Sequence, residues 1–233
     1  MTISAIDTHL ASWIGAWPPP SPGLHVVATE HRDRPGWDGA VRPLLGAVDA
    51  DGAGLVTVSP RFANAVTALL QGRPAAALDD PDLCSLVGHA VAGPGTQLGR
   101  GVLRWATQVN ADIEEVGVWR AWDDPIVPAW LAPFRGEALL ALDEDGAYAG
   151  GVGIKRHDAT GYELSVVTDA AHRGQGLARR LVATAARHHL SDVPLLTYLH
   201  DSANTGSARV ADAVGFPDRG WGVLGVWGSE AAG

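Results

Sequence analysis

The sequence predicts a fold of mixed α and β structure, α/β or α+β, in which helices flank a mixed, mostly antiparallel sheet. Two apolar runs meet at Asp145-Gly146, and this dipeptide is the strongest short-range signal for a β-hairpin. Residues 162–227 then alternate short apolar runs with helical patterns, in the order strand, helix, strand, helix, strand. Antiparallel strands followed by such an alternation indicate a mixed sheet with helices on its faces.

The C-terminal half contains most of the predicted elements. A helix begins after Gly176, and its apolar residues lie on one stripe that would pack on the sheet. A shorter helix is expected at 126–132, where Asp124-Pro125 provides a cap and a first-turn proline. A third helix is expected at 203–214. Besides the two hairpin strands, the expected strands cover 102–107, 116–122, 162–168, 194–199 and 223–227.

The N-terminal half predicts a second α/β region. Ser59-Pro60 and Asp80-Pro81 each place a capping residue before a proline, a pattern that starts helices. The glycine-rich segment 92–101 is the clearest break in the chain, so we expect one domain at 1–100 and another at 101–233. The expected strands of this half are 24–29 and 55–58, and its helices run to about residues 70 and 91.

The composition is that of an ordinary globular chain, with 233 residues of which 46% are hydrophobic. No run approaches the roughly 18 apolar residues of a membrane span, and the N-terminus lacks the pattern of a signal peptide. We therefore expect a cytoplasmic protein with no membrane partner. The formal net charge of -9 disfavours nucleic acid, whose phosphates are bound through many lysines and arginines. The single cysteine, Cys84, excludes an intramolecular disulfide and is expected to be a small buried hydrophobe.

A glycine-rich turn, Arg173-Gly174-Gln175-Gly176, separates the strand at 162–168 from the helix that follows. A nucleotide-binding P-loop is excluded, because the only lysine, Lys155, lies outside any such motif. A dinucleotide fingerprint that starts at Gly174 fails as well, because Arg179 occupies its third small position. The turn still places unpaired backbone amides at a helix N-terminus, and this arrangement suits a pyrophosphate.

Two motifs together carry a family resemblance. Residues 173–178, RGQGLA, match the pattern Q/R-x-x-G-x-G/A, and residues 204–216, NTGSARVADAVGF, match N-x-x-A/S-x-x-V/L-x-x-x-x-G-F. Both resemble the acyl-CoA-binding motif and the later helix of the GNAT superfamily of acyltransferases. The Asp145-Gly146 hairpin also lies where that fold has its second and third strands. The resemblance covers about residues 101–233 and implies a GNAT-like sheet that binds acetyl-CoA.

The resemblance also implies which residues hold the cofactor. The strand end Val166, Val167 and Thr168 would separate from its neighbour and hydrogen-bond the pantetheine arm through main-chain groups, which is compatible with ordinary strand packing. Asn204 and Ser207 would lie on the far side of that arm. For Arg179 a solvated helix face is an equal alternative to a phosphate contact. The residues expected around the pyrophosphate are Arg173, Gly174, Gln175, Gly176, Leu177, Ala178 and Arg179.

Acyl transfer to an amine requires a neutral nucleophile, a polarised carbonyl and a proton for the leaving thiolate. In many GNAT enzymes a tyrosine supplies that proton, but alignment on Gly215-Phe216 places Ala211 at its position. The nearby substitutes are Tyr198 and His200, together with Ser207. A histidine at a strand end is, however, structural more often than catalytic.

Glu163 is the candidate general base. It lies in the strand that leads to the glycine-rich turn, and strand alternation places it with Ser165 and Val167 on one face. An exposed carboxylate at a strand edge is an equally good interpretation. Asp201 is the next candidate.

No metal site is expected. His188 and His189 are adjacent and would point to different faces of their helix, and the nine histidines show no HExxH spacing. Several tryptophans precede the cofactor motif, where the GNAT superfamily builds its acceptor pocket, so we expect some to line a pocket and others to pack in the core. They are Trp105, Trp119, Trp122 and Trp130.

The leading hypothesis is an N-acetyltransferase that transfers an acetyl group from acetyl-CoA to a primary amine of a small molecule or peptide, by direct attack in a ternary complex. A CoA-binding sensor without catalysis is the main alternative, motivated by Ala211. An O-acyltransferase or an aminoglycoside-type resistance enzyme would differ only in its acceptor. The strand and helix at 55–70 fit a degenerate second GNAT-like half that shapes the acceptor site, and the sequence leaves a homodimer open.

Overall fold

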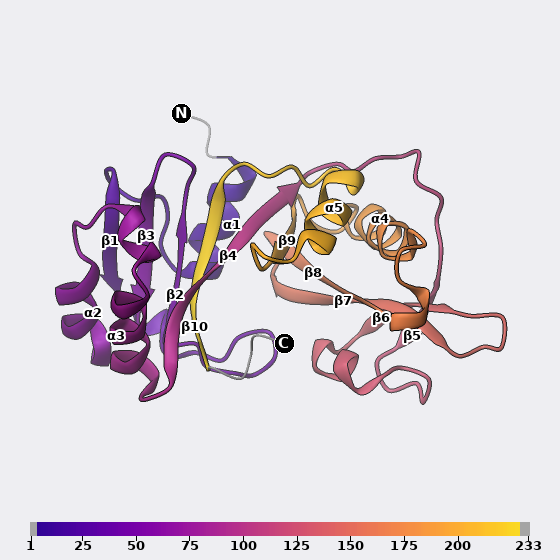
Figure 1. Cartoon of the computed structure of the whole chain (residues 1–233), viewed down its shortest axis with the longest axis horizontal. Coiled ribbons are helices and arrows are strands. Elements are labelled where there is room, and N and C mark those ends of the chain that lie inside the picture. Colours follow the sequence, from indigo (N-terminus) through magenta and orange to yellow (C-terminus); the bar gives the residue numbers. More distant parts are fainter. Residues whose placement is uncertain (1–3, 229–233) are drawn as a thin grey trace. The chain divides into compact units, whose positions relative to one another are not determined.

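The computed structural model describes residues 4–228 and divides the chain into two compact units (Figure 1). Unit 1 comprises Met1–Leu103 with Arg219–Gly233, and unit 2 comprises Arg104–Asp218. The division differs from the expected domains at the C-terminus, because the last strand pairs with strands of unit 1. Among the described residues no helix is long and apolar enough to cross a membrane.

Unit 1 has a sheet in the order β1-β3-β2-β10-β4. Only β1 and β3 are parallel, and the other neighbours are antiparallel. The strands are β1 (Gly23–Ala28), β2 (Leu44–Val48), β3 (Ala53–Val58), β4 (Thr96–Ala106) and β10 (Trp221–Gly228). The helices are α1 (Ala5–Ile14), α2 (Ala63–Leu70) and α3 (Pro81–Ala92), with 3-10 turns η1 (Glu30–Asp33), η2 (Pro60–Phe62) and η3 (Ala75–Asp79).

Of the two helix caps predicted in unit 1, only one forms. Asp80 caps α3 as expected, because its side chain accepts hydrogen bonds from the N–H groups of Asp82 and Leu83. Ser59 makes no such bond: a 3-10 turn follows it, and α2 begins only at Ala63. The expectation that Ser59 caps this helix was therefore wrong.

The expected break at 92–101 is only partly a break. Gly93 and Gly95 have positive φ values of 90° and 79° and make the turn after α3. The strand β4 begins directly after this turn and includes Gly99 and Gly101, which pair with Gly225 and Val223 of β10. Pairing with a strand more than a hundred residues away therefore overrides the local glycine signal.

The strand-then-helix order that suggested a degenerate GNAT-like half is present in β3 and α2. The parallel neighbour of β3, however, is β1 and not β4, the strand that follows the helices.

Unit 2 is a mixed, mostly antiparallel sheet flanked by helices, as predicted. Its strands lie in the order β9-β8-β7-β6-β5, and only β8 and β9 are parallel. The strands are β5 (Val118–Ala121), β6 (Glu137–Leu142), β7 (Tyr148–Asp158), β8 (Gly161–Thr168) and β9 (Leu196–His200). The helices are α4 (Leu177–His189) and α5 (Thr205–Val214), with 3-10 turns η4 (Ala129–Phe134) and η5 (Ala170–His172).

Local chemistry explains the turns and helices of unit 2. The hairpin at Asp145-Gly146 is confirmed: Gly146 has φ 80°, and the Asp143 side chain accepts the N–H groups of Asp145 and Ala147. The helix expected at 126–132 was wrong, because the segment forms only the 3-10 turn η4, which contains Pro133. The apolar stripe of α4 is buried as predicted and packs on β7 and β8 and beside α5 (Figure 1).

Candidate active site

The parallel strands β8 and β9 separate halfway along their length. Their register pairs run only from Tyr162 with Leu196 to Leu164 with Tyr198. Beyond this point β8 continues to Thr168 and stays paired with β7, where Gly150 is its last partner. The sheet therefore opens between the ends of β8 and β9, where the resemblance implied a separation.

The open edge of β8 presents main-chain groups to this gap. The Asp169 N–H donates to the Ala149 carbonyl of β7 at 2.9 Å. Because successive residues of a strand direct their N–H and C=O groups to opposite sides, Val166 and Thr168 direct theirs away from β7 and into the gap. The Thr168 carbonyl accepts a hydrogen bond from Arg173 Nε at 3.2 Å. The N–H and C=O of Val166 are thus placed to pair with an extended chain that enters the gap.

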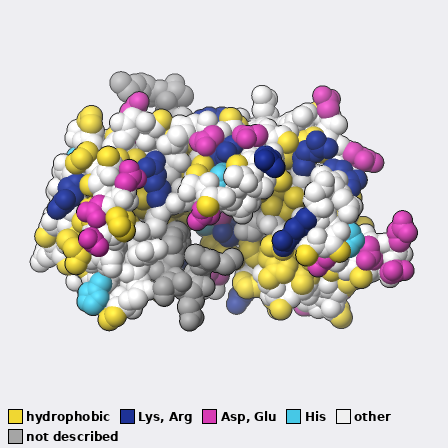
Figure 2. Space-filling model, in the orientation of Figure 1, with side chains coloured by type: hydrophobic (Ala, Val, Ile, Leu, Met, Phe, Trp, Pro, Cys, Tyr) yellow, Lys and Arg dark blue, Asp and Glu magenta, His cyan; other side chains and the backbone are white. Residues whose placement is uncertain are grey.

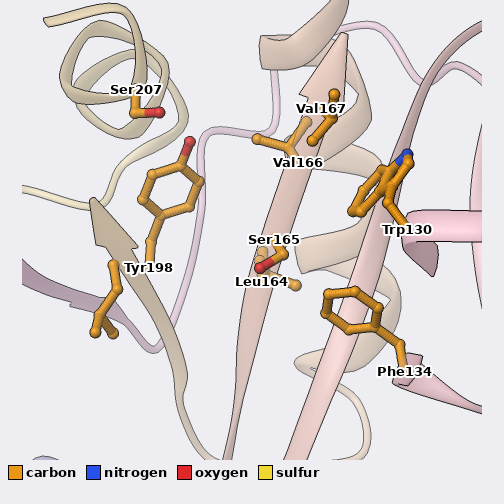
Figure 3. Close-up of a pocket in the computed structure, with 9 residues that line it drawn as sticks. Trp130, Phe134, Leu164, Ser165, Val166, Val167, Tyr198 and Ser207 are labelled. Carbon is orange, nitrogen blue, oxygen red and sulfur yellow. The ribbon is translucent and has the colours of Figure 1, made fainter. Parts of the chain in front are cut away.

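A cavity of about 270 Å³ lies at the gap. Figure 3 shows the Tyr198 hydroxyl directed toward Ser207 of α5, while Trp130 and Phe134 of η4 lie across β8 from it. Of the nine lining residues in the described chain, none is charged. They are Trp130, Phe134, Leu164, Ser165, Val166, Val167, Tyr198, Leu199 and Ser207.

Tyr198 combines burial with access to the cavity. Its side chain is 2% exposed, and burial raises the pKa of its phenol, an effect that a side-chain hydrogen bond with Ser207 only partly offsets. The phenol therefore keeps its proton at neutral pH. Ala211, at the position where the resemblance expected a tyrosine, is fully buried and lies outside the cavity lining.

The start of α5 fixes the far wall of the cavity. The Asn204 side chain accepts the N–H of Ser207 at 2.9 Å and so caps the helix. This bond holds Ser207 facing Tyr198. The structure thus places Asn204 as a helix cap beside the cavity and Ser207 in its lining.

The glycine-rich turn exposes the N-terminus of α4. Gly174 and Gly176 have φ values of 76° and 75°, which favour glycine, and Gly176 is the N-cap residue without any capping side chain. A Cβ added at Gly174 would meet no protein atom within 4 Å. Glycine is therefore required here for its backbone conformation, and the space in front of the free amides is open to an anion.

The side chains of the turn leave its backbone accessible. Gln175 Nε2 donates back to the Ala171 carbonyl at 3.3 Å, while Leu177 is buried in the core under the helix and contributes only its N–H. A Cβ added at Gly176 would lie 3.6 Å from Arg179 Nη2, so that guanidinium lies beside the turn. Arg180 instead forms an ion pair with Glu114. Figure 2 shows arginine side chains gathered over α4 and α5, whose arginines are Arg179, Arg180, Arg187 and Arg209.

Glu163 lies in an environment that differs from that of a free base. It is 3% exposed, forms an ion pair with Lys155 of the neighbouring strand β7, and has Oε2 at 3.2 Å from His157 Nε2. Burial raises its pKa, but the Lys155 ammonium and the His157 ring lower it more, to about 2. A carboxylate of such low basicity is a poor proton acceptor, so we assign Glu163 an ion-pair role. Asp201 accepts the Ala203 N–H, in the turn after β9.

Glu163→Gln should remove a pH-dependent part of the stability. A carboxylate whose pKa falls from 4.5 to about 2 on folding contributes about 3 kcal/mol above pH 4.5, and this contribution is lost as the pH falls toward 2. Urea unfolding at pH 7 should show a loss of about this size, and the loss should shrink below pH 4.5. Glu144→Gln, at an exposed hairpin position, is the matched control and should unfold like the parent. A Glu163→Gln stability curve parallel to that of the parent through this range would contradict the ion-pair role.

His200 has both ring nitrogens engaged. Its Nε2 accepts a hydrogen bond from Arg104 Nε at 2.9 Å, and its Nδ1 donates to the Asp201 carbonyl at 2.8 Å. The buried Arg104 also donates to Asp212 and to the Phe216 carbonyl. His200 is therefore part of a structural network that holds Arg104, and it does not line the cavity.

His188 and His189 do not point apart as the sequence suggested. Together with Asp192 they bring one possible ligand atom each to within 4.8 Å of one another. Packing accounts for this contact: both rings lie against Trp119, at centroid distances of 4.6 and 5.4 Å, and His189 Nδ1 is 3.3 Å from Asp192 Oδ2. Trp119 is thus a partly buried residue that packs against the core beside the end of α4.

The aromatic lining of the cavity is only partly the one expected from the sequence. Trp130 lines the cavity, whereas Trp122 is 46% exposed and lies outside the lining. Phe134 was not expected there. A Cβ added at Gly153 would lie 2.7 Å from Phe134 Cγ, so this glycine makes room for the Phe134 ring. Gly153 pairs with Ser165 of β8, which also lines the cavity. The glycines of β7 were the only signal in the sequence for a large side chain packed at this position.

A family model described as the acetyltransferase (GNAT) family matches residues 105–216. Similar solved structures include a GNAT-family protein from Novosphingobium aromaticivorans DSM 12444, 22% identical with TM-score 0.46, covering 73% of this chain and 82% of that one. A GNAT-family acetyltransferase from Colwellia psychrerythraea is 14% identical with TM-score 0.44, covering 77% and 79%. A GCN5-related N-acetyltransferase-like protein from Streptococcus suis 89/1591 is 13% identical with TM-score 0.49, covering 97% and 100%. No curated protein matches the sequence.

Proposed function

Because the chain contains a domain of the GNAT acetyltransferase family at residues 105–216, we propose that it is an N-acetyltransferase. It transfers an acetyl group from acetyl-CoA to a primary amine of a small molecule or peptide, by direct attack in a ternary complex. One observation carries the proposal: the strands β8 and β9 part at Leu164, and the open edge of β8 leads directly into the glycine turn of α4.

The donor site follows from the two sets of free main-chain groups. The N–H and C=O of Val166 face the gap and would pair with the amides of the pantetheine arm. The amides at the start of α4, after Gly174 and Gly176, would hold the pyrophosphate, with Arg179 beside them. When bound, acetyl-CoA supplies the activated thioester. This site needs no metal.

Tyr198 is the proposed proton donor. The amine nitrogen forms a bond to the acetyl carbon, the carbon–sulfur bond breaks, and the phenol proton of Tyr198 goes to the departing sulfur. The attacking amine arrives neutral, and the proton that it loses returns to the phenolate through water. The place of Tyr198 in the cavity lining, with its hydroxyl directed toward Ser207, supports this role. Ser207 is placed to orient the phenol (Figure 3).

A CoA-binding sensor without catalysis is the second candidate. It is favoured by two observations: Ala211 is buried at the position of the usual acid, and His200 and Glu163 are both engaged in internal contacts. A sensor would retain the gap and the glycine turn and would make no use of the Tyr198 proton.

Free-thiol release separates these two functions. Acetyl-CoA is incubated with the protein and a panel of primary amines, thiol is followed by its colour reaction, and the acetylated amine is identified by its mass. Amine-dependent thiol release with a matching product supports the transferase. Saturable CoA binding with no product from any amine would support the sensor instead.

A further inference from the structure

The cavity at the gap has two chemically distinct ends. Hydroxyl groups gather at the end that faces β9 and α5, where Tyr198 meets Ser207 (Figure 3). At the other end the aromatic rings of Trp130 and Phe134 form a wall, packed edge to face with centroids 5.9 Å apart. Ser165 lies between the two ends. A molecule that fills the cavity would thus place its polar group at the hydroxyls and its remainder against the rings.

The aromatic wall is tied to the strand that presents the donor site. Trp130 Nε1 donates a hydrogen bond to the Tyr148 hydroxyl at 3.3 Å, and that hydroxyl donates to the Val167 carbonyl of β8 at 3.0 Å. Val167 itself lines the cavity. Tyr148 therefore fixes the indole relative to the main chain next to Val166. Burial raises the pKa of Tyr148, so its hydroxyl keeps the proton that the second bond requires.

The wall also depends on small residues in β7. Gly153 leaves room for the Phe134 ring, and a Cβ at Gly151 would lie 3.1 Å from Leu131 of the same 3-10 turn. The turn η4 thus packs directly on the backbone of β7 and lines one end of the cavity. Its position is determined by packing and by the Trp130 hydrogen bond rather than by charge.

This inference rests on the proposed function: we propose that the acceptor carries its primary amine on an aromatic or aliphatic hydrocarbon group, which the Trp130 and Phe134 rings bind. In this arrangement Tyr148 is a positioning residue that holds Trp130 at the acceptor end. Hydrocarbon surface leaves water when it packs on these rings, while the amine remains at the hydroxyl end near the acyl carbon.

The uncharged lining of the cavity disfavours the competing class of acceptor. Polyamines, aminoglycosides and basic peptides carry several positive charges, and carboxylates near a site favour their binding. Among the nine lining residues of the described chain there is no carboxylate. The Glu163 side chain lies on the same face of β8 as Ser165 and Val167, but the Lys155 ammonium already compensates its charge.

The acceptor class is tested by comparing 2-phenylethylamine with spermidine. Each amine is titrated calorimetrically into the protein, alone and with CoA, and each is also assayed for acetylation. We expect 2-phenylethylamine to bind and to have a kcat/KM at least about tenfold above that of spermidine. Spermidine binding or reacting as well as 2-phenylethylamine would overturn the inference. If 2-phenylethylamine binds but is not acetylated, the inference on the pocket stands and the proposed transferase fails.

Tyr148→Phe tests the positioning role, because it keeps the ring and removes both hydrogen bonds. We expect the KM for 2-phenylethylamine to rise about tenfold, with kcat and the CoA dissociation constant nearly unchanged. Tyr162→Phe is the matched control: this tyrosine lies in β8 on the side that packs against α4, outside the cavity. A Tyr148→Phe enzyme with the parent's KM, or with a loss confined to kcat, would overturn the positioning role.

Discussion

Gly176→Asp should abolish CoA binding while leaving the protein folded. Gly176 is the N-cap of α4 with φ 75°, and its neighbouring amides are the ones that would hold the pyrophosphate. The substitution adds bulk in a left-handed conformation and a negative charge where another negative charge must bind. We expect the affinity measured by calorimetry to fall at least about 100-fold, because like charges in contact cost several kcal/mol.

Gly176→Asn is the matched control for this charge. Asparagine has nearly the same shape as aspartate and tolerates the left-handed region, but it is neutral. Its affinity for CoA should fall by no more than about tenfold. Circular dichroism and the melting temperature of both variants establish that they are folded. Unchanged CoA affinity in folded Gly176→Asp protein would remove the basis for the donor site.

Tyr198→Phe should lower kcat about 100-fold, in the range that general acid catalysis contributes. The substitution keeps the ring that packs against Phe216 and removes only the hydroxyl that faces Ser207. Because the hydroxyl acts on the leaving sulfur, the CoA dissociation constant and the KM for the amine should change little. Steady-state kinetics with acetyl-CoA and the best amine of the panel measure all three quantities.

Thioester reactivity provides an independent test of the same role. An acyl donor with a more acidic leaving thiol needs less help from a proton donor, so it should restore part of the rate in the Tyr198→Phe enzyme. Tyr162→Phe, the same chemical change at a tyrosine outside the cavity, should leave kcat within about twofold of the parent. A Tyr198→Phe enzyme with full kcat would show that another group, or water, protonates the sulfur.

The features of the proposed donor site were predictable from the sequence because they are local. The turn at 173–176, the helix after it and the strand before it lie within thirty residues, and glycine positions alone indicate where backbone amides are exposed. The cap of α1 was equally local but was missed: Ser4 and Asp7 form a capping box, and Gly15 ends the helix. Local signals of this kind can be read without any knowledge of the sheet.

The aromatic end of the cavity was not predictable, because it depends on contacts across the fold. Trp130 and Phe134 lie in a proline-containing 3-10 turn without helical or strand periodicity. Gly153 of β7 makes room for Phe134, and Tyr148 of β7 holds Trp130. The environment of Glu163 depends likewise on strand register. Lys155 is its direct partner across the β7–β8 pair, and a shift of one residue would have left the carboxylate on the other face.

Calorimetric titration of CoA into the 233-residue chain tests whether the β8–β9 gap and the glycine turn form one acyl-CoA site. We expect saturable binding of one CoA per chain, lost in Gly176→Asp and retained in Tyr198→Phe. The absence of saturable binding to the parent protein, or binding that Gly176→Asp leaves intact, would contradict it.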